Sequence, residues 1–128
     1  RRAGVRMLAA LGLATLAKGI IKNNVDRTRP GEVIDQRRYK LKRGSSKDKA
    51  LRSMPSGHSA GAAAVLSAAA RDFPEARVPL IGGALAIAAA QLPTRNHFLT
   101  DIAAGVALGL VAERLASLAL DSVEKRLA

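Results

Sequence analysis

Long apolar segments separated by polar breaks constrain this chain more than any other feature of its sequence. Hydrophobic residues make up 48% of the chain and aromatic residues only 2%, so Ala, Leu, Val and Ile dominate these segments. Ala and Leu are the strongest helix formers, which favours helices over strands. We expect four helices, at residues 3–21, 59–70, 80–92 and about 97–120. The predicted fold is therefore all-α: a bundle of about four helices, with a long basic loop between the first and the second.

That loop, residues 22–54, differs sharply from the apolar segments around it. Residues 36–52 alone hold eight Lys or Arg and one Asp, a net charge of +7, and the whole chain carries +11. Positive charge of this size favours an anionic partner, such as a phosphate group, an acidic lipid head group or a nucleic acid. We expect the loop to attract an anionic head group or a membrane surface; the alternative is a solvated run of charges.

The helices can be read as membrane spans or as a soluble bundle. A span needs about 20 apolar residues, and the first and last segments approach that length, although both contain charges. The mean hydropathy of +0.07 is low for a chain made only of spans. Abundant Gly, Ala and Ser let membrane helices approach closely, but an Ala-rich soluble bundle has the same composition. We favour a membrane protein with short or tilted spans.

Two short motifs are suited to binding phosphate. Lys22 and Arg29 are seven residues apart and followed by Pro30, within the basic region. Pro-Ser-Gly-His at residues 55–58 directly precedes an apolar helix. Ser is a preferred helix N-cap, Gly admits a close ligand, and free N–H groups at a helix N-terminus bind anions. Each motif alone also fits an ordinary charge run or an ordinary helix cap.

A third motif, His97-x3-Asp101, lies at the expected start of the last helix. Side chains four residues apart share one helix face, so Asp101 can accept a hydrogen bond from one imidazole nitrogen of His97. The other nitrogen is then free to act as a base or a nucleophile. A capping His followed by a first-turn Asp explains the same pair without any chemistry.

Together and in this order, the three motifs resemble the signature of the type 2 phosphatidic acid phosphatase superfamily, which includes soluble acid phosphatases and vanadium haloperoxidases. The resemblance implies that His97 attacks phosphorus and forms a phosphohistidine, that Asp101 orients it, and that His58 protonates the leaving oxygen. It implies that four groups of the first two motifs hold the phosphate oxygens: Lys22, Arg29, the Ser56 hydroxyl and the Gly57 N–H. It implies no metal and no cofactor. It also implies helices before Arg1, within a larger six-helix membrane domain.

One position departs from the family pattern. The Arg expected six residues before the motif-three His is replaced by Gln91, and the nearest Arg is Arg95. Either Arg95 reaches the phosphate from the loop, or Gln91 donates a neutral hydrogen bond, which is about half as strong as a charge-assisted one. We expect residues 1–128 to form a single phosphatase-like domain whose site retains its nucleophile and its acid.

The favoured function is hydrolysis of a lipid phosphate or diphosphate by a multi-pass protein of a bacterial-type inner (cell) membrane. Alternatives are a soluble acid phosphatase of the same fold and an inactive, anion-binding member of the family. Nucleic acid is not an expected partner, because the chain has one Tyr, no Trp and no recognisable nucleic-acid motif. The family pattern favours an outward-facing site, whereas the positive-inside rule would place the basic loop in the cytoplasm.

Overall fold

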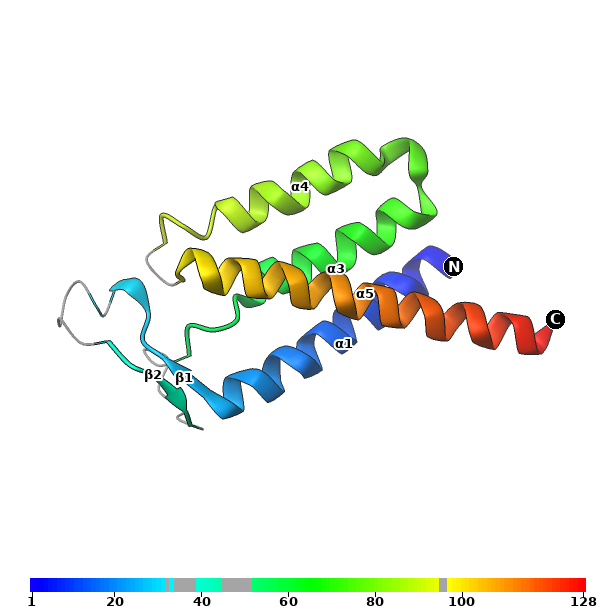
Figure 1. The fold of residues 1–128 in the computed structure, drawn as a ribbon. Helices are drawn as coiled ribbons and strands as arrows, with labels where there is room; N and C mark the ends of the chain where they lie inside the picture. The colour runs from blue at the N-terminus through cyan, green and yellow to red at the C-terminus, as the bar shows by residue number, and fades with distance from the viewer. Residues whose placement is uncertain (32, 34–38, 45–51, 95–96) are drawn as a thin grey trace.

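The structure is a computed structural model that describes residues 1–31, 33, 39–44, 52–94 and 97–128. Within these ranges four long helices follow one another along the chain (Figure 1): α1 (Arg2–Asn24), α3 (Gly57–Asp72), α4 (Arg77–Ala89) and α5 (Leu99–Leu127). A short 3-10 helix, η2 (Pro74–Ala76), joins α3 to α4. The predicted all-α bundle of four helices is confirmed. Its last helix extends beyond the predicted residue 120, through the charged residues at the end of the chain.

The helix α3 lies at the centre of the bundle. It packs against α1, α4 and α5, and α1 also packs against α5. By contrast α4 rests on α3 and has little contact with α5 (Figure 1). The starts of α3 and α5 therefore lie at the same end of the bundle as the end of α1, and the two chain termini lie at the other end.

Two short strands, which the sequence did not predict, cross the end of the bundle at which α3 and α5 begin. β1 (Val25–Arg27) continues directly from α1 and pairs antiparallel with β2 (Leu41–Arg43). A single parallel bridge joins Arg27 to Arg52, so the far end of the basic loop returns to the same strand. Strands of three residues, most of them charged, carry no alternation of apolar and polar side chains from which to predict them.

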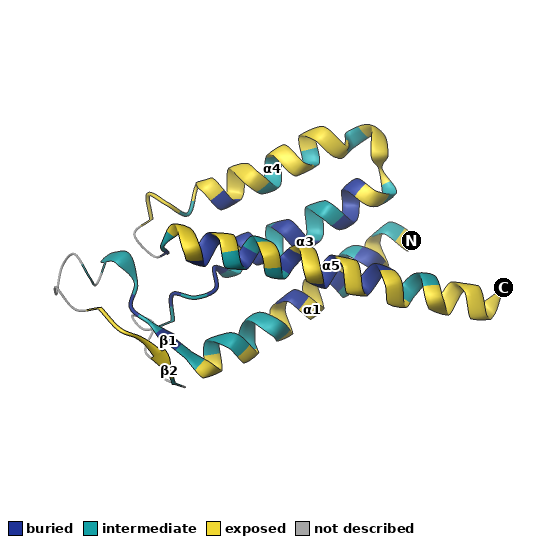
Figure 2. Ribbon diagram, viewed as in Figure 1, coloured by how far each residue is buried: buried dark blue, intermediate teal, exposed yellow. Residues whose placement is uncertain are grey.

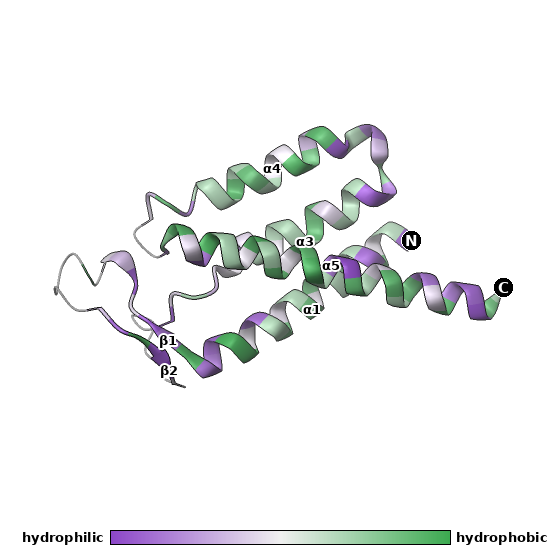
Figure 3. Cartoon of the chain, viewed as in Figure 1, coloured by the Kyte–Doolittle hydropathy of each residue, from purple (hydrophilic) through white to green (hydrophobic). Residues whose placement is uncertain are grey.

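Small side chains fill the interior, and large apolar ones face outward. The core cluster consists only of alanines, namely Ala10, Ala14, Ala64, Ala68, Ala112 and Ala116. Many Leu, Ile and Val side chains are instead exposed, for example Leu8 at 71% and Leu16 at 67%. Figure 2 shows these exposed positions along the helices, and Figure 3 shows that many of them are hydrophobic. This distribution is the reverse of that in an ordinary soluble protein.

Glycines of α5 allow its close approach to α3. A Cβ atom built on Gly105 would lie 2.5 Å from the carbonyl oxygen of Ser56, and one on Gly109 would lie 2.3 Å from that of Ala60. Both distances are far below van der Waals contact, so neither position accommodates a side chain without a shift of backbone. The Gly-x-x-x-Gly spacing is the one that brings membrane helices together.

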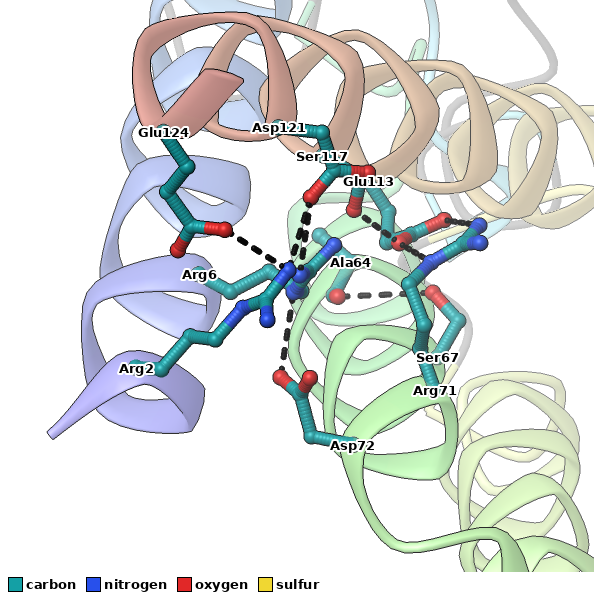
Figure 4. Close-up of polar contacts among 10 residues, drawn as sticks. All are labelled: Arg2, Arg6, Ala64, Ser67, Arg71, Asp72, Glu113, Ser117, Asp121 and Glu124. Carbon is teal, nitrogen blue, oxygen red and sulfur yellow. Dashed lines mark hydrogen bonds and ion pairs between the residues drawn. The ribbon is translucent and has the colours of Figure 1, made fainter. Parts of the chain in front are cut away.

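An ion-pair cluster ties the helices together at the end of the bundle that carries the termini (Figure 4). The buried Arg6 of α1 pairs with Asp72 of α3 at 3.0 Å and with Asp121 of α5 at 3.3 Å. Arg71 of α3 holds Glu113 of α5 through two hydrogen bonds, of 2.7 and 3.1 Å. Charges at this end thus connect α1, α3 and α5, the same three helices that meet at the opposite end of the bundle, where α3 and α5 begin.

Two of the helices, α1 and α5, are long and apolar enough to cross a membrane. Only 17% of the most apolar window of α1 is buried inside the bundle, and 39% of that of α5. The core helix of a soluble protein would have most of this surface covered. The apolar surface of both helices is therefore available to a nonpolar environment.

Candidate active site

His97 is held by the backbone that precedes the second motif. Its ring is 7% exposed, and its Nδ1 atom lies 2.7 Å from the carbonyl oxygen of Ser53. A carbonyl oxygen can only accept a hydrogen bond, so Nδ1 carries the proton of the neutral ring. The lone pair is then on Nε2. This is the tautomer that a nucleophilic histidine requires.

Asp101 joins all three motif regions at one point. The carboxylate is completely buried; its Oδ1 pairs with the Arg27 guanidinium at 2.8 Å. Its Oδ2 accepts a short hydrogen bond from the Ser53 hydroxyl and another, of 2.7 Å, from the Phe98 N–H. The carbonyl oxygen of Asp101 accepts from the Ser56 N–H at 3.0 Å. We expected Asp101 to accept directly from His97, but the acceptor here is the Ser53 carbonyl, and Asp101 holds Ser53.

Burial is the main influence on the pKa of His97 and lowers it below its usual value. The positive charges of Lys22 and Arg29 lower it as well, whereas the hydrogen bond to Ser53 and the charge of Asp101 raise it. The neutral, nucleophilic form is therefore favoured at neutral pH. The charges of the first-motif cations thus act on the histidine of the third motif.

The second motif forms the N-terminus of α3, as predicted. Ser56 is the N-cap, and its side chain accepts a hydrogen bond of 3.4 Å from the Ser59 N–H. Gly57 and His58 occupy the first turn, where N–H groups have no intrahelical partner. His58 is exposed, whereas Ser56 is completely buried. The Ser56 hydroxyl thus serves the helix, while the backbone N–H groups and His58 are placed for a ligand.

Lysines of α1 reach toward the same helix N-terminus. A Cβ built on Gly57 would lie 3.2 Å from Cδ and 3.5 Å from Nζ of Lys18. Lys22, one turn further along α1, donates a hydrogen bond of 2.6 Å to the Arg52 carbonyl. Side chains four residues apart lie on one face of a helix, so Lys18 and Lys22 present two positive charges to this end of α3.

No described residue takes the place of the missing third-motif cation beside His97. Arg95 lies outside the described residues, as does most of the basic segment 36–52. Gln91 is described; it lies two residues after the end of α4, and its amide donates a 3.4 Å hydrogen bond to the carbonyl of Ile87 in that helix. In the described part of the chain, Gln91 therefore interacts with α4 rather than with the histidine.

Three residues of the site escaped the sequence analysis: Arg27, Ser53 and Lys18. Arg27 binds Asp101, places its guanidinium 4.5 Å from the centre of the Phe98 ring, and accepts the Ser53 N–H at 3.1 Å through its carbonyl. It lies in a region full of basic residues, so its charge did not distinguish it. Ser53 acts partly through its backbone, for which no residue type is diagnostic. Lys18 lies near the end of an apolar helix, where a single charge does not by itself indicate a site.

Comparison with known proteins identifies the family of the chain. The family model described as PAP2 superfamily matches residues 3–123, nearly the whole chain. No curated protein and no solved structure matches the chain. Among the described residues, no group of three His, Cys, Asp or Glu side chains is placed to hold a metal ion. The described part of the site offers an imidazole, a carboxylate, cationic side chains and helix N–H groups.

Proposed function

Because the chain belongs to the PAP2 superfamily, we propose that it is a phosphatase that hydrolyses a phosphate ester through a phosphohistidine at His97. One observation carries the proposal: the buried His97 ring donates from Nδ1 to the Ser53 carbonyl and keeps its Nε2 lone pair available. Its lowered pKa maintains that lone pair at neutral pH. A histidine that served only as a helix cap would need neither burial nor neighbouring cations.

The reaction proceeds in two steps. In the first, Nε2 of His97 forms a bond to phosphorus while the bond from phosphorus to the leaving oxygen breaks, and His58 gives that oxygen a proton. In the second, His58 takes a proton from water, the water oxygen attacks phosphorus, and the bond from phosphorus to nitrogen breaks. Inorganic phosphate leaves and both histidines return to their first state. The nucleophile and the acid are both side chains, so the proposal includes no metal and no cofactor.

Positive groups at one end of the bundle hold the phosphate oxygens. Lys22, Arg29 and the Gly57 N–H take this role, because negative charge spreads over those oxygens in the transition state. Ser56 contributes as the N-cap, whose hydroxyl accepts the Ser59 N–H and leaves the N–H groups of Gly57 and His58 to the ligand. Arg95, two residues before His97 in the sequence, supplies the remaining cation in place of the residue that Gln91 replaces.

Arg27 and Ser53 act as positioning residues for His97. Arg27 and Asp101 form a buried ion pair, Asp101 accepts from the Ser53 hydroxyl, and the Ser53 carbonyl accepts from the imidazole. The Arg27 carbonyl also accepts from the Ser53 N–H. Ser53 is thus fixed at its N–H and its hydroxyl, which leaves its carbonyl in one orientation and fixes the ring that donates to it.

The substrate is a lipid phosphate or diphosphate in the bilayer that surrounds the protein. The support is the distribution of side chains, with alanine inside and large aliphatic residues outside, and the two helices long enough to span. We take residues 1–128 as one phosphatase-like domain within a larger six-helix, multi-pass protein of a bacterial-type inner membrane. Following the family pattern, its site faces outward.

A hydrolysis panel tests this proposal. The purified protein is given a long-chain lipid monophosphate, a lipid diphosphate and para-nitrophenyl phosphate, and released phosphate is measured. Turnover should favour the lipids and fall by a factor on the order of 10⁴ or more in His97→Ala. Arg126→Gln, a change at the far end of α5, is the control and should leave turnover unchanged.

Three other outcomes would contradict the proposed function or the proposed nucleophile. Preference for the water-soluble ester would make the protein a soluble-type acid phosphatase of the same fold. No turnover with any ester would contradict the proposed phosphatase activity. Turnover that survives in His97→Ala would remove the proposed nucleophile.

A further inference from the structure

A groove between α3, α4 and α5 lies away from the proposed active site. Its volume is about 540 Å³, and most of its lining is aliphatic, including Ala63, Ile81, Leu85, Val106 and Leu110. It exists because α4 rests on α3 and has little contact with α5. The volume falls within the range of about 300–1,000 Å³ typical of ligand pockets, and so does the mostly apolar lining.

One end of the groove is polar and carries a net positive charge. Arg71, Arg77 and Glu113 line it. Arg71 neutralises Glu113 through two hydrogen bonds, and the Ser117 hydroxyl donates to the same carboxylate at 2.6 Å (Figure 4). Within the described residues, Arg77 has no hydrogen bond or ion pair. Its charge is thus available to an anion, and the second terminal nitrogen of Arg71 can donate beside it.

The groove also opens onto apolar surface. Ile81, Leu85 and Leu110 at its margin are 39%, 59% and 48% exposed. A water-soluble anion would gain nothing from such walls, whereas a hydrocarbon chain would be removed from contact with water or packed against matching side chains. The occupant that fits both ends therefore has an anionic head and an aliphatic tail.

We propose that this groove binds an anionic phospholipid, with an acyl chain along α4 and its head group at Arg77 and Arg71. This lipid is not the substrate. Glu113 is twelve residues beyond Asp101 on α5, which places the polar end of the groove about 18 Å along the helix from the active site. The head group thus lies toward the opposite side of the bundle, on the membrane leaflet away from His97. The proposal depends on the bilayer setting but not on the phosphatase chemistry.

Tryptophan fluorescence provides the test, because the chain contains no Trp. Leu85→Trp places the only Trp at the groove, and Ile87→Trp places one on the same helix outside the groove lining. Each variant of the protein is reconstituted into phosphatidylcholine bilayers that contain a minor fraction of lipid with brominated acyl chains. The brominated lipid is phosphatidylglycerol in one arm and phosphatidylcholine in the other, and it quenches Trp on contact.

We expect Leu85→Trp to be quenched preferentially by the anionic lipid. The preference should be about fivefold in relative affinity, the effect of one basic group near an anionic head group. Adding Arg77→Gln should abolish the preference, whereas Arg114→Gln, which removes an exposed charge outside the groove, should leave it intact. Ile87→Trp should respond equally to both lipids.

Two results would overturn the proposal. Equal quenching of Leu85→Trp by both lipids would show apolar contact without recognition of the head group. Protection of Leu85→Trp from both lipids would show that a protein segment or a second copy covers the groove. If Leu85→Trp does not fold, Ile81→Trp on the same wall serves in its place, with the same expectations.

Discussion

Replacing Arg27 by glutamine should lower the free energy of unfolding by about 3–4 kcal/mol. The change leaves the carboxylate of Asp101 buried without its ion-pair partner, and breaking a buried pair in this way costs about 3–5 kcal/mol. The lower part of that range applies because Asp101 keeps its hydrogen bonds from Ser53 and from the Phe98 N–H. Loss of the Arg27 contact with the Phe98 ring adds about 0.5–1 kcal/mol.

Equilibrium denaturation of four proteins measures this effect: wild type, Arg27→Gln, Asp101→Asn and the double variant. The double variant removes both charges, so it should be more stable than the sum of the single changes predicts, by a coupling energy of about 1–3 kcal/mol. Arg43→Gln on the neighbouring strand is the control, because Arg43 is exposed, and should change stability by about 0.5 kcal/mol or less. Strict additivity would refute the inferred ion pair.

The pH–rate profile of Arg27→Gln gives a second measurement, which a loss of stability alone would not change. Among the described residues, the charges of Lys22, Arg29 and Asp101 act on His97. Removing the positive charge of Arg27 strengthens the field of Asp101, which raises the pKa of His97. The acidic limb of the pH–rate profile should therefore move to higher pH in Arg27→Gln, and Arg27→Lys should return it toward wild type. An unchanged limb would contradict the positioning role of Arg27.

The remaining predictions concern three other parts of the structure. In the wild type, the acidic limb of the pH–rate profile should lie below about pH 6.5, the ordinary pKa of histidine, because the pKa of His97 is lowered; a limb well above pH 6.5 would contradict the assignment. The stability that the neutral ring of His97 contributes is present above its pKa in the unfolded chain and is lost as pH falls through its lower pKa in the folded chain. Gly105→Ala should destabilise by about 1–3 kcal/mol and reduce turnover, because its Cβ meets the Ser56 carbonyl. Gly12→Ala, with open space around it, should instead stabilise by up to about 1 kcal/mol in the same denaturation assay. Arg6→Met should lower thermal stability without altering the pH profile, because its ion pairs lie at the opposite end of the bundle; a shifted profile would show that the two ends are coupled.

The helices could be predicted from sequence because their signals are local. Ala-rich and Leu-rich composition favours helix residue by residue, and Ser56 is a recognisable N-cap where α3 begins. The hairpin of β1 and β2 had no such signal, since its strands are short and largely charged. Its pairing depends on contacts across a loop rather than on any property of residues 25–27 alone.

The candidate site residues that sequence alone singles out are those whose type defines the chemistry. Lys22, His58, His97 and Asp101 stand out because few side chains can bind phosphate or transfer protons. Ser53 does not, because its part in orienting the imidazole is played by a carbonyl oxygen that every residue possesses. Only the folded chain shows which carbonyl His97 reaches.

Trapping the covalent intermediate tests the central claim most directly. The protein is mixed with a lipid phosphate labelled with ³²P, quenched with alkali within one turnover, digested, and the labelled peptide is sequenced by mass spectrometry. The proposal predicts an alkali-stable, acid-labile phosphate on His97, which is absent in His97→Ala. Turnover of the substrate with no labelled peptide, or with the label on another residue, would contradict the assignment of His97 as the nucleophile.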